Sequence, residues 1–84
     1  MRHDAEFFAE TELDLVFISR RLREALKLES LLTEEGVDYL IKTGTYLGGF
    51  LFKRELAGAF FYVPSSDAER ARQLLLSNRY LPEV

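Results

Sequence analysis

The sequence predicts an α+β fold, a ferredoxin-like βαββαβ sandwich in which an antiparallel sheet carries two helices on one face. An apolar, β-prone run at 13–18 leads directly into a helical pattern over 19–35. A second strand-like run at 37–42 follows that helix at once. A third run at 57–63 precedes a second helical pattern over 66–78. The elements therefore follow the order strand, helix, strand, strand, helix that this fold requires.

The first strand, 13–18, is apolar on both alternating faces apart from Asp14, which predicts a central strand buried from both sides. Ser19 is placed to cap the helix that follows, because its hydroxyl can accept a free N–H of the first turn. Gly36 is predicted to end that helix, since glycine adopts the left-handed conformation without strain. The apolar residues of the helix form an arc wider than the usual stripe and predict burial on more than one side: Leu22, Ala25, Leu26, Leu28, Leu31 and Leu32.

The second strand, 37–42, alternates in polarity and is expected to have one drier face. The segment that follows, 43–56, is predicted to be extended and only partly ordered, because its three glycines favour a loop or a bulge. The alternative is a hairpin in which 50–52 forms a strand that pairs back through a turn at Lys53-Arg54-Glu55.

The third strand, 57–63, ends at Pro64, which has no N–H with which to continue a ladder. Ser66 and Glu69 have the spacing of a capping box and predict the start of the second helix. The stretch 79–82 is predicted to add a short edge strand, which would complete the βαββαβ order.

Length and composition predict one small domain. A chain of 84 residues is too short for two cores, so residues 13–84 are assigned to a single α+β domain and residues 1–12 to an N-terminal arm. The net charge of −3 argues against general binding of nucleic acid, which needs a basic surface. No apolar run reaches the ~18–20 residues of a membrane span, and the start lacks the apolar core of a signal peptide. We therefore expect a soluble, cytoplasmic protein.

The residue inventory argues against catalysis and metal binding. Cysteine is absent and His3 is the single histidine, so neither a thiolate site nor a structural zinc site is expected. The usual acid–base and nucleophile combinations cannot be assembled from this inventory. Glu29 lies within the apolar arc of the first helix and is a candidate buried acid, the alternative being that it reaches water or pairs with an arginine. We expect a protein that is not an enzyme and that uses no cofactor.

Several short motifs along the chain together resemble those of a known family. They are, in order, Leu15-Val16-Phe17, Glu24-Ala25, Leu31-Leu32 before Glu35-Gly36-Val37, and Val63-Pro64 followed by Asp67-Ala68-Glu69-Arg70-Ala71 and Leu74-Leu75. With these motifs, the stretch from Leu13 to about Leu76 resembles the prokaryotic signal transducing protein family, a group of small bacterial domains of uncharacterised function. The resemblance implies a ferredoxin-like core related in shape to the PII-type regulators. The cysteine-based metal segment of some family members is missing here, and the nucleotide-binding motifs of the PII regulators are not recognisable, so neither ligand is carried over.

The start of the first helix is a candidate anion site. The sequence Ser19-Arg20-Arg21-Leu22-Arg23 places three guanidiniums where a helix has free N–H groups and partial positive charge. A carboxylate or phosphate held by Ser19, Arg20 and Arg21 would accept hydrogen bonds from the free N–H groups and offset the positive charge. The alternative is a solvated basic turn that pairs with Glu24 or with the acidic arm.

The Gly-rich stretch 44–49 fits neither the spacing of a P-loop nor that of a dinucleotide-binding motif. Long connections in small domains are often functional, so Tyr46, Lys53 and Arg54 are added to the predicted ligand-binding residues. The aromatic side chains of Tyr46, Phe50 and Phe52 would then clamp a ligand or a partner. The alternative is a mobile connection with no other role.

The sheet face opposite the helices is the predicted interface of a homo-oligomer. Five apolar residues are expected on this face: Val16, Ile18, Leu40, Phe60 and Tyr62. A monomer would expose them as one apolar patch, and such patches commonly mark an interface. The alternative is that residues 1–12 or 46–52 fold over the patch.

These predictions lead to a small regulatory or signal-transducing binding module that responds to a small anionic ligand or to a protein partner. The alternative is a homo-oligomeric protein–protein assembly domain with no small-molecule ligand. Neither nucleic acid nor a membrane is expected as a partner.

Overall fold

Three strands and two helices make up the regular structure of this chain. The structure is a computed structural model, and it describes residues 1–48 and 54–80. The elements along the chain are β1 (Leu13–Ser19), α1 (Leu22–Glu34), β2 (Leu40–Gly48), β3 (Arg54–Pro64), a 3₁₀ turn (Ser65–Asp67) and α2 (Ala68–Ser77).

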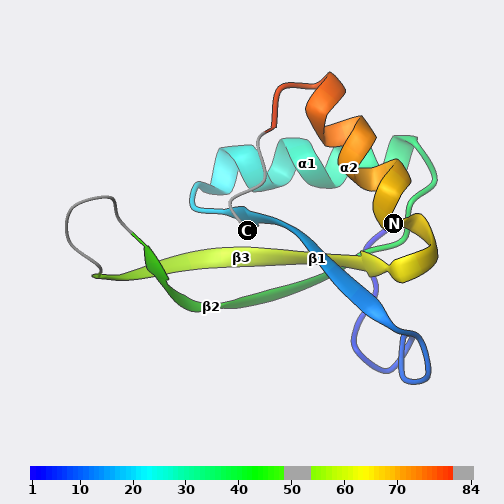
Figure 1. Cartoon of the computed structure of the whole chain (residues 1–84), viewed down its shortest axis with the longest axis horizontal. Coiled ribbons are helices and arrows are strands. Elements are labelled where there is room, and N and C mark those ends of the chain that lie inside the picture. Colours follow the sequence, from blue (N-terminus) through cyan, green and yellow to red (C-terminus); the bar gives the residue numbers. More distant parts are fainter. Residues whose placement is uncertain (49–53, 81–84) are drawn as a thin grey trace.

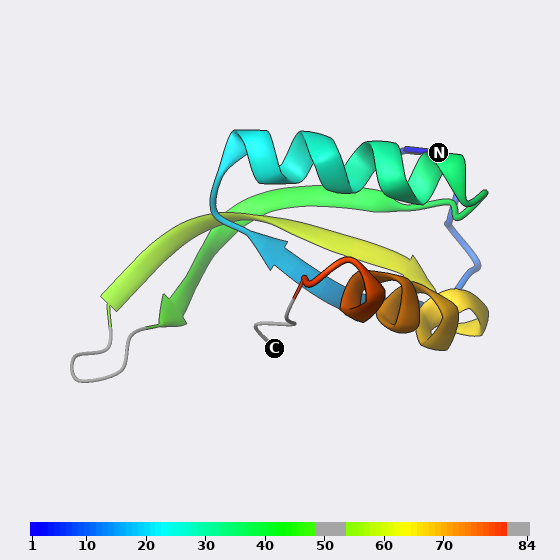
Figure 2. The same cartoon turned by 90° about the horizontal axis from the view of Figure 1, so that it is seen from above.

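β3 is the central strand of a three-stranded antiparallel sheet with the strand order β1-β3-β2, so the prediction that the strand at 13–18 is central is wrong. Both helices lie on one face of this sheet, as Figures 1 and 2 show. The α+β class is therefore confirmed. The full ferredoxin-like βαββαβ order is not, because the described residues contain no fourth strand. Residues 78–80 follow α2 without strand structure, and the rest of the edge strand predicted at 79–82 lies outside the described residues.

The core fills the space between the helices and the sheet. Leu28 and Leu32 of α1 and Ala71 and Leu75 of α2 are fully buried in one cluster with Phe61 of β3. Each helix pair is spaced by four residues, which places its members on one face of the helix. In the part of the chain that the structure describes, no helix is long and apolar enough to span a membrane.

An irregularity in β1 changes which side chains face the core. Leu15 pairs with Tyr62 and Phe17 pairs with Phe61, so Val16 is one extra residue in the ladder. A bulge of this kind interrupts the alternation of faces, and both Val16 and Phe17 join the core cluster. The prediction that Val16 lies on the open face is therefore wrong, because alternation does not continue through the bulge.

The two predicted serine caps do not form, whereas the predicted glycine stop does. The N-cap position of α1 is Arg21 and that of α2 is Asp67, and neither has a side-chain cap. Ser19 is instead the last residue of β1, and Ser66 lies in the 3₁₀ turn. Gly36 follows α1 with φ of 71°, which is the left-handed conformation expected of it.

β2 and β3 form a long hairpin, which corrects the prediction of a partly ordered segment at 43–56. The ladder extends without interruption to the pair Gly48 and Arg54, so two of the three glycines lie inside a strand. A hairpin is therefore present, but the turn predicted for it at 53–55 is wrong, because Arg54 and Glu55 lie in β3 and pair with β2. Its predicted strand at 50–52 belongs to residues 49–53, which lie outside the described residues.

The N-terminal arm is ordered and continues the sheet beyond β2. Arg2 forms a parallel bridge with Tyr39, and the N–H of His3 donates to the Tyr39 carbonyl oxygen at 2.9 Å. Phe8 is 4 % exposed, so the arm also buries an aromatic side chain. Figure 1 shows the chain before β1 looping on the side of the sheet away from the helices. The structure therefore supports the alternative in which residues 1–12 cover part of the open face.

Candidate functional site

A pocket lies where the β2–β3 hairpin extends beyond the helices. Figures 1 and 2 show that the outer part of the hairpin is left uncovered on its helix-side face. The pocket has a volume of about 320 Å³. Residues 57–59 of β3 and residues 43–44 of β2 form its floor, and Leu22 and Ala25 of α1 form its wall.

The pocket exists because β3 changes from large to small side chains along its length. Phe61 fills the space beneath the helices, whereas Ala57 and Ala59, on the same face, leave a hollow. Gly58 faces the other side of the sheet, where a Cβ atom would lie 2.8 Å from Cγ2 of Ile18. Two small residues thus open the pocket, and the third allows β1 to pack closely on the opposite face.

The wall of the pocket continues into an exposed apolar surface on α1. Leu22 is 76 % exposed, and Leu26, one turn later, is exposed as well. A second hollow of about 390 Å³ runs along this side of α1 and shares Leu22 with the pocket. Exposed Leu47 lies on the same face of the hairpin as the pocket floor. The predicted burial of a second side of α1 is therefore wrong for Leu22 and Leu26 among the described residues.

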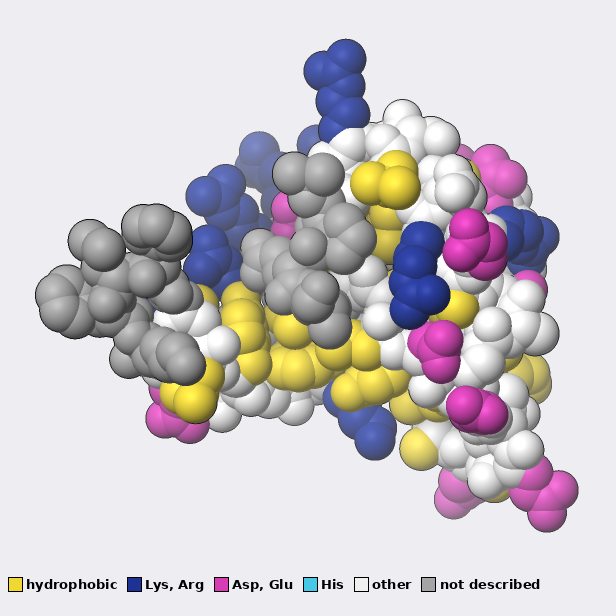
Figure 3. Space-filling view, viewed as in Figure 1, with side chains coloured by type: hydrophobic (Ala, Val, Ile, Leu, Met, Phe, Trp, Pro, Cys, Tyr) yellow, Lys and Arg dark blue, Asp and Glu magenta, His cyan; other side chains and the backbone are white. Residues whose placement is uncertain are grey.

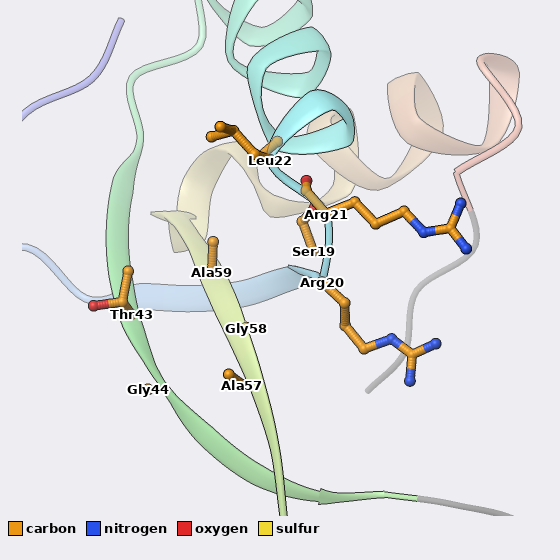
Figure 4. Close-up of a pocket in the computed structure, with 10 residues that line it drawn as sticks. Ser19, Arg20, Arg21, Leu22, Thr43, Gly44, Ala57, Gly58 and Ala59 are labelled. Atoms are coloured by element: carbon orange, nitrogen blue, oxygen red, sulfur yellow. The ribbon is translucent and has the colours of Figure 1, made fainter.

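Cations gather at the rim of this apolar surface. Arg20 and Arg21 line the pocket, and Arg23 and Lys27 line the adjoining hollow. Figure 4 shows that the side chains of Arg20 and Arg21 extend away from Leu22 and the pocket floor. Within the described ranges, none of these four cations forms an ion pair with a carboxylate. Positive charge is unfavourable at a helix N-terminus, so an anion bound here would be stabilised both by the side chains and by the helix.

Ser19 lines the pocket, but its hydroxyl already has partners inside the chain. The oxygen lies 2.9 Å from Oε1 of Glu24 and 3.1 Å from the carbonyl oxygen of Arg21. Ser19 is also buried. It therefore fixes the junction of β1 and α1 and does not offer a free hydroxyl to a ligand.

Tyr46 and Arg54, which are also predicted to bind the ligand, do not line the pocket. Tyr46 packs edge-to-face on Phe60 with ring centroids 5.8 Å apart, on the sheet face away from the helices. Arg54 is on that same face. It lies five residues along β3 from Ala59 of the pocket floor, which is about 17 Å along the strand. Lys53 lies outside the described residues. Arg54 is therefore not brought to the arginines at the start of α1. The Tyr46 ring does lie near the junction that precedes them, because a Cβ atom on Gly58 would be 3.2 Å from Cε1 of Tyr46 and 3.3 Å from the carbonyl oxygen of Ser19.

The predicted oligomer interface is smaller than expected. Ile18 pairs with Phe60 and Leu40 pairs with Tyr62, so these four residues do share the open face. Ile18 and Leu40 are only 5 % and 6 % exposed within the single chain. Phe60 and Tyr62 are half-buried. The role of this face as a homo-oligomer interface stays a prediction.

Glu29 has structural partners at the other end of α1. The Tyr39 hydroxyl donates to Oε1 of Glu29 at 2.9 Å, and Nη1 of Arg2 lies 3.9 Å from the same oxygen. Burial raises the pKa of Tyr39 above its usual value, and Glu29 adds to this shift while the Thr33 side chain opposes it. The alternative in which Glu29 pairs with an arginine is therefore the one the structure supports. Among residues 1–48 and 54–80, no three His, Asp or Glu side chains gather as a metal site.

The apolar part of the site is what sequence reasoning misses. Leu22 and Leu26 do carry a signal, because they widen the apolar arc of α1 beyond what one core-facing side needs. Leu47, Ala57 and Ala59 carry none, since the face on which they lie depends on the register of the hairpin.

Comparisons with protein-family models, with curated proteins and with solved structures find no match for this chain. The resemblance to the prokaryotic signal transducing protein family therefore stays a prediction. The pocket offers a ligand apolar walls, a floor of small residues and, at its rim, guanidiniums that have no carboxylate partner among the described residues.

Proposed function

We propose that the protein is a small regulatory binding module whose ligand is a carboxylate or phosphate attached to an apolar group. The observation that carries this proposal is the apolar pocket rimmed by Arg20 and Arg21, which have no carboxylate partner among the described residues. Burying an apolar group against Leu22 and the alanine floor is favourable by about 25 cal/mol per Å². Because the side chains of Arg20 and Arg21 extend away from the pocket floor, they would hold a head group that projects out of the pocket, through charge-assisted hydrogen bonds.

The proposal assigns binding and not a reaction to this pocket. Apart from backbone groups and Ser19, its polar side chains are guanidiniums and the hydroxyl of Thr43. A guanidinium stays protonated in proteins and therefore does not serve as a general base near neutral pH. His3, the single histidine, belongs to the N-terminal arm and lies away from the pocket. Its Nε2 is 3.0 Å from Oδ1 of Asp38. The regulatory role itself comes from the family resemblance.

A thermal-shift measurement with decanoate, acetate and inorganic phosphate tests the proposal. Decanoate combines a carboxylate with an apolar chain, whereas acetate and phosphate have only the charge. A ligand at a hundred times its Kd stabilises the folded state by about 2.7 kcal/mol. In a domain of this size, that raises the melting temperature by roughly 10–20 °C. We expect this rise with decanoate and little change with acetate or phosphate.

Variants locate the response. Leu22→Asp puts a carboxylate on the exposed wall and should abolish the decanoate shift, and the double change of Arg20 and Arg21 to Gln should reduce it. Arg70→Gln is the matched control, because Arg70 is an exposed arginine on α2 that pairs with Asp67 at 3.7 Å. A decanoate shift that survives Leu22→Asp, or falls equally in Arg70→Gln, would contradict the proposal.

A further inference from the structure

The two ends of this molecule carry opposite charge. The first end contains the starts of β1 and β2, as the pairs of Leu13 with Pro64 and of Leu40 with Tyr62 establish. The acidic turn, residues 4–12, lies at this end, whereas the start of α1 and the hairpin lie at the other (Figure 1). In Figure 3, most Asp and Glu side chains lie toward the first end, and Lys and Arg predominate beside the hairpin. Four carboxylates of the turn and four cations of α1 and its start make this contrast: Asp4, Glu6, Glu10 and Glu12, against Arg20, Arg21, Arg23 and Lys27.

The acidic turn presents one fixed aromatic ring to solvent. Phe7 is 56 % exposed, whereas its neighbour Phe8 is buried. The N–H of Phe7 donates to Oδ1 of Asp4 at 3.1 Å, and the ring of His3 stacks on the ring of Phe7 with centroids 3.6 Å apart. His3 is held in turn by Asp38. A ring that is already fixed loses less conformational freedom when a partner binds it.

We infer that the occupant of the pocket at the start of α1 is the acidic turn of a second copy of this chain. Phe7 of one copy lies between Leu22 and the alanine floor of the next, and the carboxylates around it face Arg20 and Arg21. The two surfaces match in shape and in charge, because an exposed ring flanked by carboxylates meets an apolar hollow flanked by cations. This inference rests on the proposed function, because it names a protein segment as the apolar anion that the pocket takes.

The contact has to form between copies. The longest extent of the molecule is 37 Å. The acidic turn and the start of α1, which lines the pocket, lie toward opposite ends of the molecule and on opposite sides of the sheet (Figure 1). The two surfaces differ, so the association is head-to-tail and gives rings or open chains of copies rather than a symmetric dimer. One small contact of this kind binds weakly, with a Kd on the order of 0.1–1 mM. Added salt weakens it because the charges are exposed.

Sedimentation velocity at rising protein concentration and low ionic strength tests the inference. The wild-type chain should form species larger than a dimer, whereas Phe7→Ser and Leu22→Asp should each stay monomeric. An equimolar mixture of these two variants should form a dimer and stop there. In that mixture, the intact turn of the Leu22→Asp chain docks in the intact pocket of the Phe7→Ser chain, and neither chain can add a third copy. Leu76→Ser, which changes an exposed leucine of α2, is the matched control and should assemble like the wild type.

Three outcomes overturn the inference: a wild-type chain that stays monomeric, a Phe7→Ser or Leu22→Asp chain that assembles like the wild type, or a mixture that gives no dimer. Glu10→Lys is a second turn variant that keeps Phe7 and should also weaken assembly, in case Phe7→Ser fails to fold.

Decanoate binding separates this inference from the proposed function. If Phe7→Ser and the wild type bind decanoate and the wild type never assembles, the function stands and the second copy is not the occupant. If the wild type assembles and binds no decanoate, the pocket serves assembly alone and the proposed function is wrong.

Discussion

At the scale of single residues, two glycines that face each other across the hairpin have different reasons to be small. Gly58 of β3 pairs with Gly44 of β2. A Cβ atom on Gly58 would lie 2.8 Å from Cγ2 of Ile18 and 3.3 Å from the carbonyl oxygen of Ser19. A Cβ atom on Gly44 would have no atom within 4 Å among the described residues. Only Gly58 is therefore required by the packing of β1 on β3.

Gly58→Ala should lower the free energy of unfolding by about 1–3 kcal/mol, because β1 has to shift to admit the methyl group. Gly44→Ala is the matched control and should leave stability unchanged or raise it by up to about 1 kcal/mol, since alanine restricts the unfolded chain. Urea denaturation of both variants measures the difference. Equal effects at the two positions would show that close packing is not the reason for Gly58.

At the scale of elements, the bulge in β1 determines which of two neighbouring residues belongs to the core. Val16 is buried in the core cluster, and Leu15 is half-buried on the other face. The bulge lets one short strand contribute two successive side chains, Val16 and Phe17, beneath the helices. This compensates for a core that is small in a chain of 84 residues.

Val16→Ala should lower the free energy of unfolding by about 2 kcal/mol, because it leaves a cavity in the core. Leu15→Ala removes a larger side chain but should cost only about 1 kcal/mol, since that side chain is half-solvated. Urea denaturation of both variants gives the order of the two costs. Regular alternation along β1 predicts the reverse order, so a larger cost for Leu15→Ala would argue against the bulge.

At the scale of the whole molecule, the N-terminal arm is part of the fold and also its most acidic surface. The arm pairs with Tyr39 next to β2 and buries Phe8, while Phe7 faces solvent. Two adjacent aromatic residues therefore have opposite roles, one in the stability of the single chain and one in the contact proposed between copies.

Phe8→Ala should lower the free energy of unfolding by about 3 kcal/mol, as expected for an aromatic side chain removed from a buried site. Phe7→Ala should change it by less than about 1 kcal/mol. Urea denaturation in dilute solution, where association is negligible, gives both values. A large cost for Phe7→Ala would mean that the exposed ring supports the fold itself, which would weaken its assignment as a docking group.

The order of the elements is predictable from the sequence because local signals mark it. Gly36 ends α1 where its left-handed conformation indicates, and Pro64 closes β3. The serine caps are not predictable in this way. The Ser19 hydroxyl bonds to the Glu24 carboxylate, and the N-cap position of α1 is Arg21, two residues later. The hairpin strands are hidden by Gly44 and Gly48, whose low strand propensity is overridden by cross-strand pairing with β3.

The charged part of the candidate site is predictable, and its apolar part is not. The place of Arg20 and Arg21 at the start of a helix is predictable, and both residues line the pocket, whereas their binding of an anion stays a prediction. Tyr46 is separated from the pocket floor because β2 is a strand, and alternation along it turns Tyr46 to the other face. That separation follows only once the register is known, since a shift of one residue would exchange the two faces.

The strand order also determines when this chain can fold during its synthesis. β1 and β2 are made first, but neither pairs with the other, because each forms its ladder with β3. Once β3 is complete, the local hairpin with β2 can close in about 1–10 μs. β1 has to close a loop of about 40 residues, from Ser19 to Ala59, and pays more entropy to do so. Until the ribosome has released β3, the apolar residues of β1 have no sheet to join, so a nascent chain paused before that strand is vulnerable to aggregation through them.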